Sequence, residues 1–173
     1  MFANRPAASP DRLARNFKVA ISSLVVLCID QITKAWAVVA LDDRIIDLVW
    51  TLRLRLVHNT GFAFSAGSGL GPVPALAAIV IIGVLWSSRR RVRAGWAASG
   101  LGGIIGGALG NLTDRLFRGA GWGRGAVVDF VDLQWWPIFN LADASITVGL
   151  VIVLFHLYRT ERRSLRTPEG APE

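Results

Sequence analysis

GGIIGGALGNLTDR, residues 102–115, is the stretch of sequence that decides the fold. Gly102, Gly106 and Gly110 recur every fourth residue in an apolar run, and such small-xxx-small steps let a second helix backbone approach closely inside a membrane. The run ends in polar residues, among them Asp114, and acids near a bilayer are costly and tend to be functional. We therefore expect a closely packed transmembrane helix that ends at a candidate functional site.

Three other apolar runs accompany this one, and together they occupy residues 18–40, 72–88, 94–111 and 140–158. The chain is 53% hydrophobic and only 18% charged, against about 25% charged in ordinary soluble domains. Each run is long enough to cross a hydrocarbon core of roughly 30 Å. The sequence predicts an all-α membrane protein with four transmembrane helices. Residues 16–158 form one membrane domain between a disordered tail, 1–15, and a solvated tail, 159–173.

The net charge of +7 does not indicate nucleic acid, because the charges fall between the apolar runs and form no basic face. Twelve Lys and Arg residues lie on the side of the two termini and the 89–93 connection, against seven on the other side. By the positive-inside rule, both termini face the cytoplasm of a bacterial inner membrane. The acids of the polar clusters then lie on the outer face.

The first outer loop, residues 41–71, contains the alternating stretch WTLRLRL, residues 50–56. This period indicates a strand half immersed at the membrane surface, and a lone strand would leave its edges unpaired. We expect a small extracytoplasmic β platform there. The first apolar run contains Asp30 and Lys34, which favours an uncleaved helix over a cleaved signal peptide. Cys28, the single cysteine, excludes an internal disulfide and a Cys-based zinc site.

Three acids, Asp114, Asp129 and Asp143, map to the outer face within about thirty residues. Two carboxylates brought close together cannot both ionise easily, so one becomes a base for water and the other an acid. Asp143 also has a local role, because it stands three residues after Asn140, a good N-cap. The residues alone leave open which two acids pair, although Arg115 beside Asp114 favours a structural, ion-paired role for that acid. Asp30 and Lys34, four residues apart, indicate a structural ion pair.

Other chemistries fit these residues less well. His58 and His156 fall on opposite membrane faces, so no H-E-x-x-H zinc site exists and no metal or other cofactor is expected. No G-x-S-x-G surrounds any serine, although a Ser–Lys dyad of Ser65 with Lys34 is conceivable. An ion-coupled transporter or a membrane scaffold is disfavoured, because the acids gather at one surface and the chain has no internal repeat.

The motifs together resemble the lipoprotein signal peptidases (signal peptidase II, aspartyl type) over roughly residues 24–155. The matching pieces, in order, are DQITK at 30–34, NTGFAF at 59–64, GGALGNLTDR at 106–115, VVDF at 127–130 and FNLAD at 139–143. One departure is Phe62, where the family usually has Ala, and its bulk is expected to crowd the substrate pocket.

The resemblance implies an aspartic endopeptidase that removes the signal peptide from diacylglyceryl-modified prolipoproteins, cutting just before the lipid-bearing Cys. It implies Asp129 and Asp143 as the catalytic pair, no metal or cofactor, a monomer, and lipid-modified prolipoproteins and membrane lipid as partners. The residues it implies for substrate binding and support of the site are Asp30, Lys34, Asn59, Gly61, Asn111, Asp114, Arg115 and Asn140.

Overall fold

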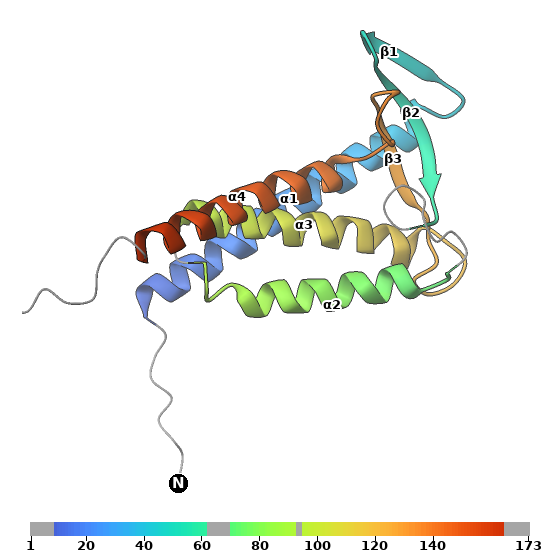
Figure 1. Ribbon diagram of the computed structural model, residues 1–173. Coiled ribbons are helices and arrows are strands. Elements are labelled where there is room, and N and C mark those ends of the chain that lie inside the picture. The colour runs from blue at the N-terminus through green and yellow to red at the C-terminus, as the bar shows by residue number, and fades with distance from the viewer. Residues whose placement is uncertain (1–8, 62–69, 93–94, 165–173) are drawn as a thin grey trace, which may run out of the picture.

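The computed structural model describes residues 9–61, 70–92 and 95–164, so the prediction for Phe62 lies outside the described residues. Figure 1 shows the helices side by side, with a small sheet beyond one end of the bundle and the start of α1 and the end of α4 at the other. The elements are α1 (Pro10–Ala40), β1 (Ile45–Val49), β2 (Leu52–Asn59), α2 (Val73–Ser88), α3 (Gly95–Phe117), β3 (Val127–Asp132) and α4 (Leu141–Ser164).

Among the described helices, α1 and α4 are long and apolar enough to cross a membrane, and α2 is a shorter apolar helix. Two boundaries differ from the expectation. α1 begins at Pro10, so residues 10–15 are helical and their assignment to a disordered tail was wrong. Proline suits the first helical position and Asp11 suits the positive end of the helix dipole. α4 continues to Ser164 through residues 159–164, which have mostly good helix propensity.

The central helix of the bundle is α3, which packs against α1 and α4 along two glycine-lined faces. A Cβ added to Gly102 would stand 2.6 Å from the carbonyl oxygen of Val19 on α1. On the other face, a Cβ on Gly107 would stand 2.5 Å from the carbonyl oxygen of Ala142 on α4. Any larger residue at either position would push two backbones apart. The expected close packing of this helix is therefore present, and it occurs on two faces instead of one.

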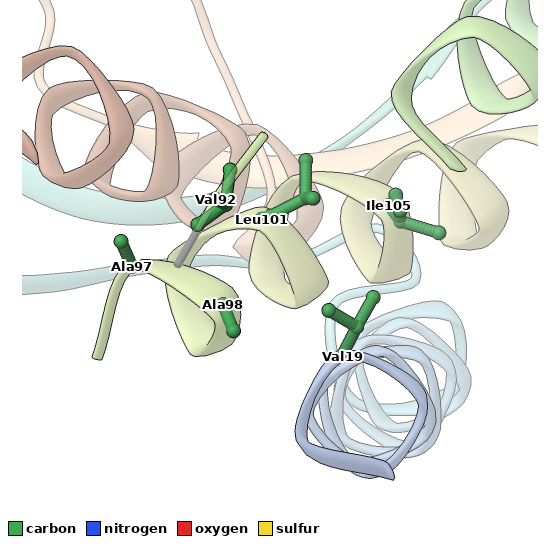
Figure 2. Packing of buried hydrophobic residues seen from close by; sticks show 6 residues of the cluster. All are labelled: Val19, Val92, Ala97, Ala98, Leu101 and Ile105. Carbon is green, nitrogen blue, oxygen red and sulfur yellow. The ribbon is translucent and has the colours of Figure 1, made fainter. Parts of the chain in front are cut away.

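Two apolar clusters hold these elements together. The first joins α1 to the early part of α3, and Figure 2 shows Val19 pointing from α1 toward Ile105. Side chains of α2 and α4 pack around it. The second cluster joins the end of α1 to β3, through Ala37 on the helix, Leu41 directly after it, and Val128 and Phe130 on the strand. This second cluster fixes the position of β3, and with it the position of the acid that the strand carries.

The sheet is antiparallel in the order β1-β2-β3. The expected strand in the first outer loop exists, but it begins at Leu52, because Trp50 has a φ of 50° and lies in the turn between β1 and β2. This strand, β2, pairs with β3, a partner that the sequence did not predict. β3 follows α3 in the chain, and its Asp129 lies opposite Val57 of β2. The sheet therefore joins the first loop to a candidate catalytic acid.

Candidate active site

A cavity of about 270 Å³ opens where α3, β3 and the start of α4 meet. Among the described residues that line it, the carboxylates are Asp129 and Asp143. The remaining lining residues are Asn59, Asn111, Arg115, Val127, Trp136, Pro137, Ile138, Phe139, Ile146 and Thr147. A mostly apolar cavity with a few convergent polar groups is the usual form of a small-molecule or peptide-bond site.

Asp129 lies in the middle of β3 and is 3% exposed. Its Oδ1 accepts a hydrogen bond from Asn140 Nδ2 at 2.7 Å, and its Oδ2 accepts one from Asn59 Nδ2 at 3.1 Å. Burial raises the pKa of Asp129 to about 6; the Asn59 hydrogen bond opposes this rise and the nearby charge of Asp143 adds to it. Asp129 therefore keeps its proton to a higher pH than an ordinary Asp does.

Asp143 lies in the first turn of α4 and forms a reciprocal capping box with Asn140. Its Oδ2 accepts the Asn140 backbone N–H at 3.2 Å, and its own N–H donates to Asn140 Oδ1 at 3.0 Å. The helix dipole and these donors favour an anion at this place. The local prediction for this helix start is confirmed, and the same carboxylate also faces the cavity.

Two asparagines connect the two carboxylates. Asn140 contacts both acids, since its side-chain amide reaches Asp129 and its backbone N–H reaches Asp143. Asn111 on α3 donates to Asp143 Oδ1 at 2.9 Å and accepts from Asn140 Nδ2 at 3.1 Å. Because amide donors approach both carboxylates, the two side chains are held in fixed orientations around one bridging residue.

A buried charge cluster lies directly behind these asparagines. Lys34 is fully buried, and its three donor positions match three acceptors: Asp30 Oδ2 at 2.8 Å, Asp114 Oδ2 at 2.9 Å and Asn111 Oδ1 at 2.8 Å. Asp30 Oδ1 also accepts the Ala142 N–H at 3.0 Å, which satisfies an otherwise unpaired donor at the start of α4. The cluster thus fixes α1, α3 and α4 relative to one another at the level of the cavity.

Asp114 belongs to this cluster, and it is not among the described residues that line the cavity. Its Oδ1 accepts from Arg118 Nε at 2.7 Å and from Gln31 Nε2 at 3.2 Å, and its Oδ2 accepts the Val128 N–H at 3.2 Å. The partner suggested by the sequence, Arg115, instead lines the cavity and donates to the Gly61 carbonyl. Gly61 in turn donates its N–H to Asn59 Oδ1 at 3.0 Å.

The structure therefore divides the residues singled out from the sequence into two groups. The first group lines the cavity and consists of Asn59, Asn111, Arg115, Asp129 and Asp143. The second group forms the buried charge cluster beside the cavity and consists of Asp30, Lys34 and Asp114. Gln31 and Arg118, which the sequence reasoning did not assign to the site, contribute to this cluster. Gln31 lies in the DQITK motif, and this motif could have indicated its contribution to the site. Residues 136–138, which line the cavity, carried only the signal of a Trp pair, whereas Phe139 begins the FNLAD motif. No group of three or more metal-ligating side chains occurs in residues 9–61, 70–92 and 95–164.

Comparison with solved structures shows a shared fold. One structure, described as a bacterial membrane enzyme determined by the in meso method at 2.3 Å, matches with a TM-score of 0.74 and 23% identity. The match covers 89% of this chain and 94% of that one.

The family model for signal peptidase (SPase) II matches residues 22–159. A lipoprotein signal peptidase of Mycobacterium tuberculosis is 44% identical over 154 residues, which are 87% of this chain and 74% of that protein. One of Mycobacterium leprae is 45% identical over 133 residues, 75% of this chain and 66% of that protein. The chain belongs to the signal peptidase II family, a family of proteases, and with its apolar helices it is a bacterial membrane protein.

Proposed function

We propose that this protein removes the signal peptide from diacylglyceryl-modified prolipoproteins as an aspartic endopeptidase, cutting just before the lipid-bearing Cys. The observation that carries the proposal is the placement of Asp129 and Asp143 on one cavity in two different environments. The relatives named lipoprotein signal peptidase supply the substrate class.

The different environments support different roles for the two acids. Asp143, at a helix start with amide donors around it, is the base that takes a proton from water. The resulting hydroxide attacks the carbonyl carbon of the residue before the Cys. Asp129, with its raised pKa, donates its proton to the departing amide nitrogen, so that the C–N bond breaks and the new amine leaves neutral. Asn111 and Asn140 keep both carboxylates oriented.

The charge distribution supports the membrane placement of the reaction. We propose four transmembrane helices, both termini in the cytoplasm, and the cavity at the outer surface, where a lipid-anchored substrate would present its cleavage site. The sheet lies at the end of the bundle away from the C-terminal ends of α2 and α4 (Figure 1), and those two ends carry the arginines of residues 89–91 and 159–163. A basic inner side and an acidic outer side follow the positive-inside rule.

The test is cleavage of a diacylglyceryl prolipopeptide by the purified protein in detergent, with the products identified by mass spectrometry. We expect one cut before the lipidated Cys, unaffected by strong chelators. Asp129→Asn and Asp143→Asn should each lower the rate by roughly 10²–10⁴-fold. Asp47→Asn, an exposed acid on β1, is the matched control and should cleave normally. Loss of cleavage on chelation with recovery on zinc, or full activity of either variant, would refute the proposal.

A further inference from the structure

The far end of the bundle, away from the proposed catalytic acids, carries a second polar hollow. It has a volume of about 120 Å³ and is lined by Trp96 of α3 and by His156, Arg159, Thr160 and Arg163 of α4. His156 is buried, while the two arginines are exposed. A hollow with two guanidinium groups and a hydroxyl is suited to a phosphate group, since arginine binds phosphate through a planar fork of donors.

An apolar groove of about 400 Å³ adjoins this hollow. Gly100, Gly103 and Gly149 are among its lining residues, and the small side chains leave the space open. The remaining lining residues are Val26 on α1, Trp96 and Ser99 on α3, and Leu141, Ala144, Ser145, Val148 and Ile152 on α4. The groove offers almost no charged group, so its natural content in a membrane is a hydrocarbon chain.

The hollow and the groove are neighbours that share one lining residue. Trp96 lines both of them, and its ring stands 5.3 Å from the ring of His156. On α4, Gly149, Ile152, His156 and Arg163 follow one another at spacings of three, four and seven, so they share a helix face. The groove along residues 141–152 is about 16 Å long at 1.5 Å per residue, close to half of a roughly 30 Å hydrocarbon core.

We propose that the hollow and the groove together bind one anionic phospholipid, with the phosphate between Arg159 and Arg163 and an acyl chain in the groove. The match is of charge and of shape: the cationic hollow suits an anionic head group, and the apolar groove begins at Ile152, one helical turn along α4 from His156 of the hollow. Basic pockets between transmembrane helices commonly bind such head groups. The site is separate from the cavity of Asp129 and does not depend on the reaction proposed there.

The arginines of this region also help to orient the chain in the membrane. Arg162 is the control that distinguishes this general role from specific lipid binding. Arg162 has the same charge and lies on the same helical turn, but its guanidinium stands over the Tyr158 ring at 5.1 Å and does not line the hollow. A general attraction of basic residues to anionic lipid involves all three arginines. A specific site involves Arg159 and Arg163 and spares Arg162.

The experiment is native mass spectrometry of the full chain with phosphatidylglycerol, and with phosphatidylcholine of the same acyl chains as the neutral comparison. We expect the wild type to retain phosphatidylglycerol preferentially and inorganic phosphate not to compete. The double variant Arg159→Gln/Arg163→Gln should bind phosphatidylglycerol roughly tenfold more weakly or worse. Arg162→Gln should stay within about twofold of the wild type, as expected for a rim charge. Thermal melting checks that each variant is folded.

A second variant tests the groove independently of charge. Ser99→Phe places a ring into the groove from the exposed face of α3 and should weaken long-chain phosphatidylglycerol while leaving a short-chain form unaffected. The proposal is overturned if the double variant keeps the lipid preference, if Arg162→Gln loses it equally, or if filling the groove changes nothing.

Discussion

Lys34 on α1 donates to Asn111 Oδ1 on α3 at 2.8 Å, so the buried charge cluster and the candidate active site share one hydrogen bond. Asn111 uses its other amide atom to hold Asp143. A change in the cluster is therefore expected to reach the proposed catalytic carboxylate of Asp143 through a single side chain.

Replacement of Lys34 by Met should strongly destabilise the protein. The change leaves Asp30 and Asp114 buried without the cation that both contact, and breaking such a pair costs about 3–5 kcal/mol. The apparent melting temperature in detergent and the amount of protein in the membrane should both fall. Arg118→Gln is the matched control, because Arg118 also pairs with Asp114 but is 29% exposed and should cost less. Equal stability of Lys34→Met and wild type would contradict the bracing role.

Asp114→Asn should behave as a stability variant and not as a catalytic one. Asp114 accepts from Lys34, Arg118 and the β3 backbone and is absent from the described lining of the cavity. We expect less folded protein but residual cleavage per folded molecule, whereas Asp129→Asn should fold and not cleave. Specific activity normalised to folded protein decides the matter. A dead, well-folded Asp114→Asn beside an active Asp129→Asn would show that the pair is wrongly assigned.

The stability of the wild type should fall relative to Asp129→Asn as pH rises from about 4 to 7. The pKa of Asp129 is about 6 in the folded protein against 3.8 for an ordinary Asp, so the folded state binds this proton more tightly. The bound proton stabilises the folded state below pH 3.8, and this stabilisation is lost as the pH rises through 6. A shift of about two pKa units corresponds to about 3 kcal/mol. Melting curves of both proteins across this range measure the difference.

Asp132 on the same strand provides the opposite control. Burial alone would raise its pKa, but the hydrogen bond from Arg53, at 2.8 Å, and other donors and charges lower it below the ordinary value. Its contribution to stability is therefore present above pH 3.8 and lost on acidification through its folded pKa. Relative to Asp132→Asn, the wild type should gain stability between pH 3 and 5. If the stability difference between wild type and variant changed with pH in the same direction for Asp129 and Asp132, the opposite pKa shifts of the two acids would be contradicted.

Peptidase activity should decline as the pH rises above about 6. The proposed reaction needs Asp129 protonated and Asp143 ionised, and the pKa of Asp129 is about 6. Above that pH, kcat/KM for a lipopeptide should drop by about tenfold per pH unit, since kcat/KM reports the free enzyme. The profile is measured under conditions where melting shows the protein to be folded. A flat profile between pH 6 and 8 would exclude Asp129 as the proton donor.

The proposed topology predicts the location of reporter fusions. Fusions after Arg91 and Arg163 should report the cytoplasm, and fusions after Asp43 and Gly121 should report the exterior, because the cations outnumber those of the other side by twelve to seven. Alkaline phosphatase, active outside, and a fluorescent protein, active inside, give complementary signals. An exterior signal at Arg91 would rule out the four-span arrangement and move the cavity to another face.

Features that depend on residues close in sequence were predictable. The close packing of the Gly-rich helix, the capping box of Asn140 with Asp143 and the Asp30–Lys34 pair follow from spacings of three or four residues, which an α-helix places side by side. The sequence left the cation partner of Asp114 open between Arg115 and another residue, and the ion-pair partners are Arg118 and Lys34. Arg115 is the next residue and projects about 100° away around the helix, while Arg118 is one turn on and stacks beside the acid.

Features that join distant segments were not predictable from one sequence. β2 was expected, but its pairing with β3 connects residues about seventy apart, and nothing in either strand specifies the partner. Lys34 likewise meets Asp114 only because the glycines of α3 let α1 approach.

The arrangement of ion pairs bears on how the chain is assembled in the membrane. Asp30 has Lys34 one turn away on α1, and Asp114 has Arg118 one turn away on α3. In the proposed topology, each of these helices carries the counter-charge for its acid on its own surface, which lowers the cost of transferring that acid into lipid. The bond from Lys34 to Asp114 forms only when the two helices meet. The charge of each acid is thus balanced within its own helix, and the bond between α1 and α3 adds to a balance that each helix already has.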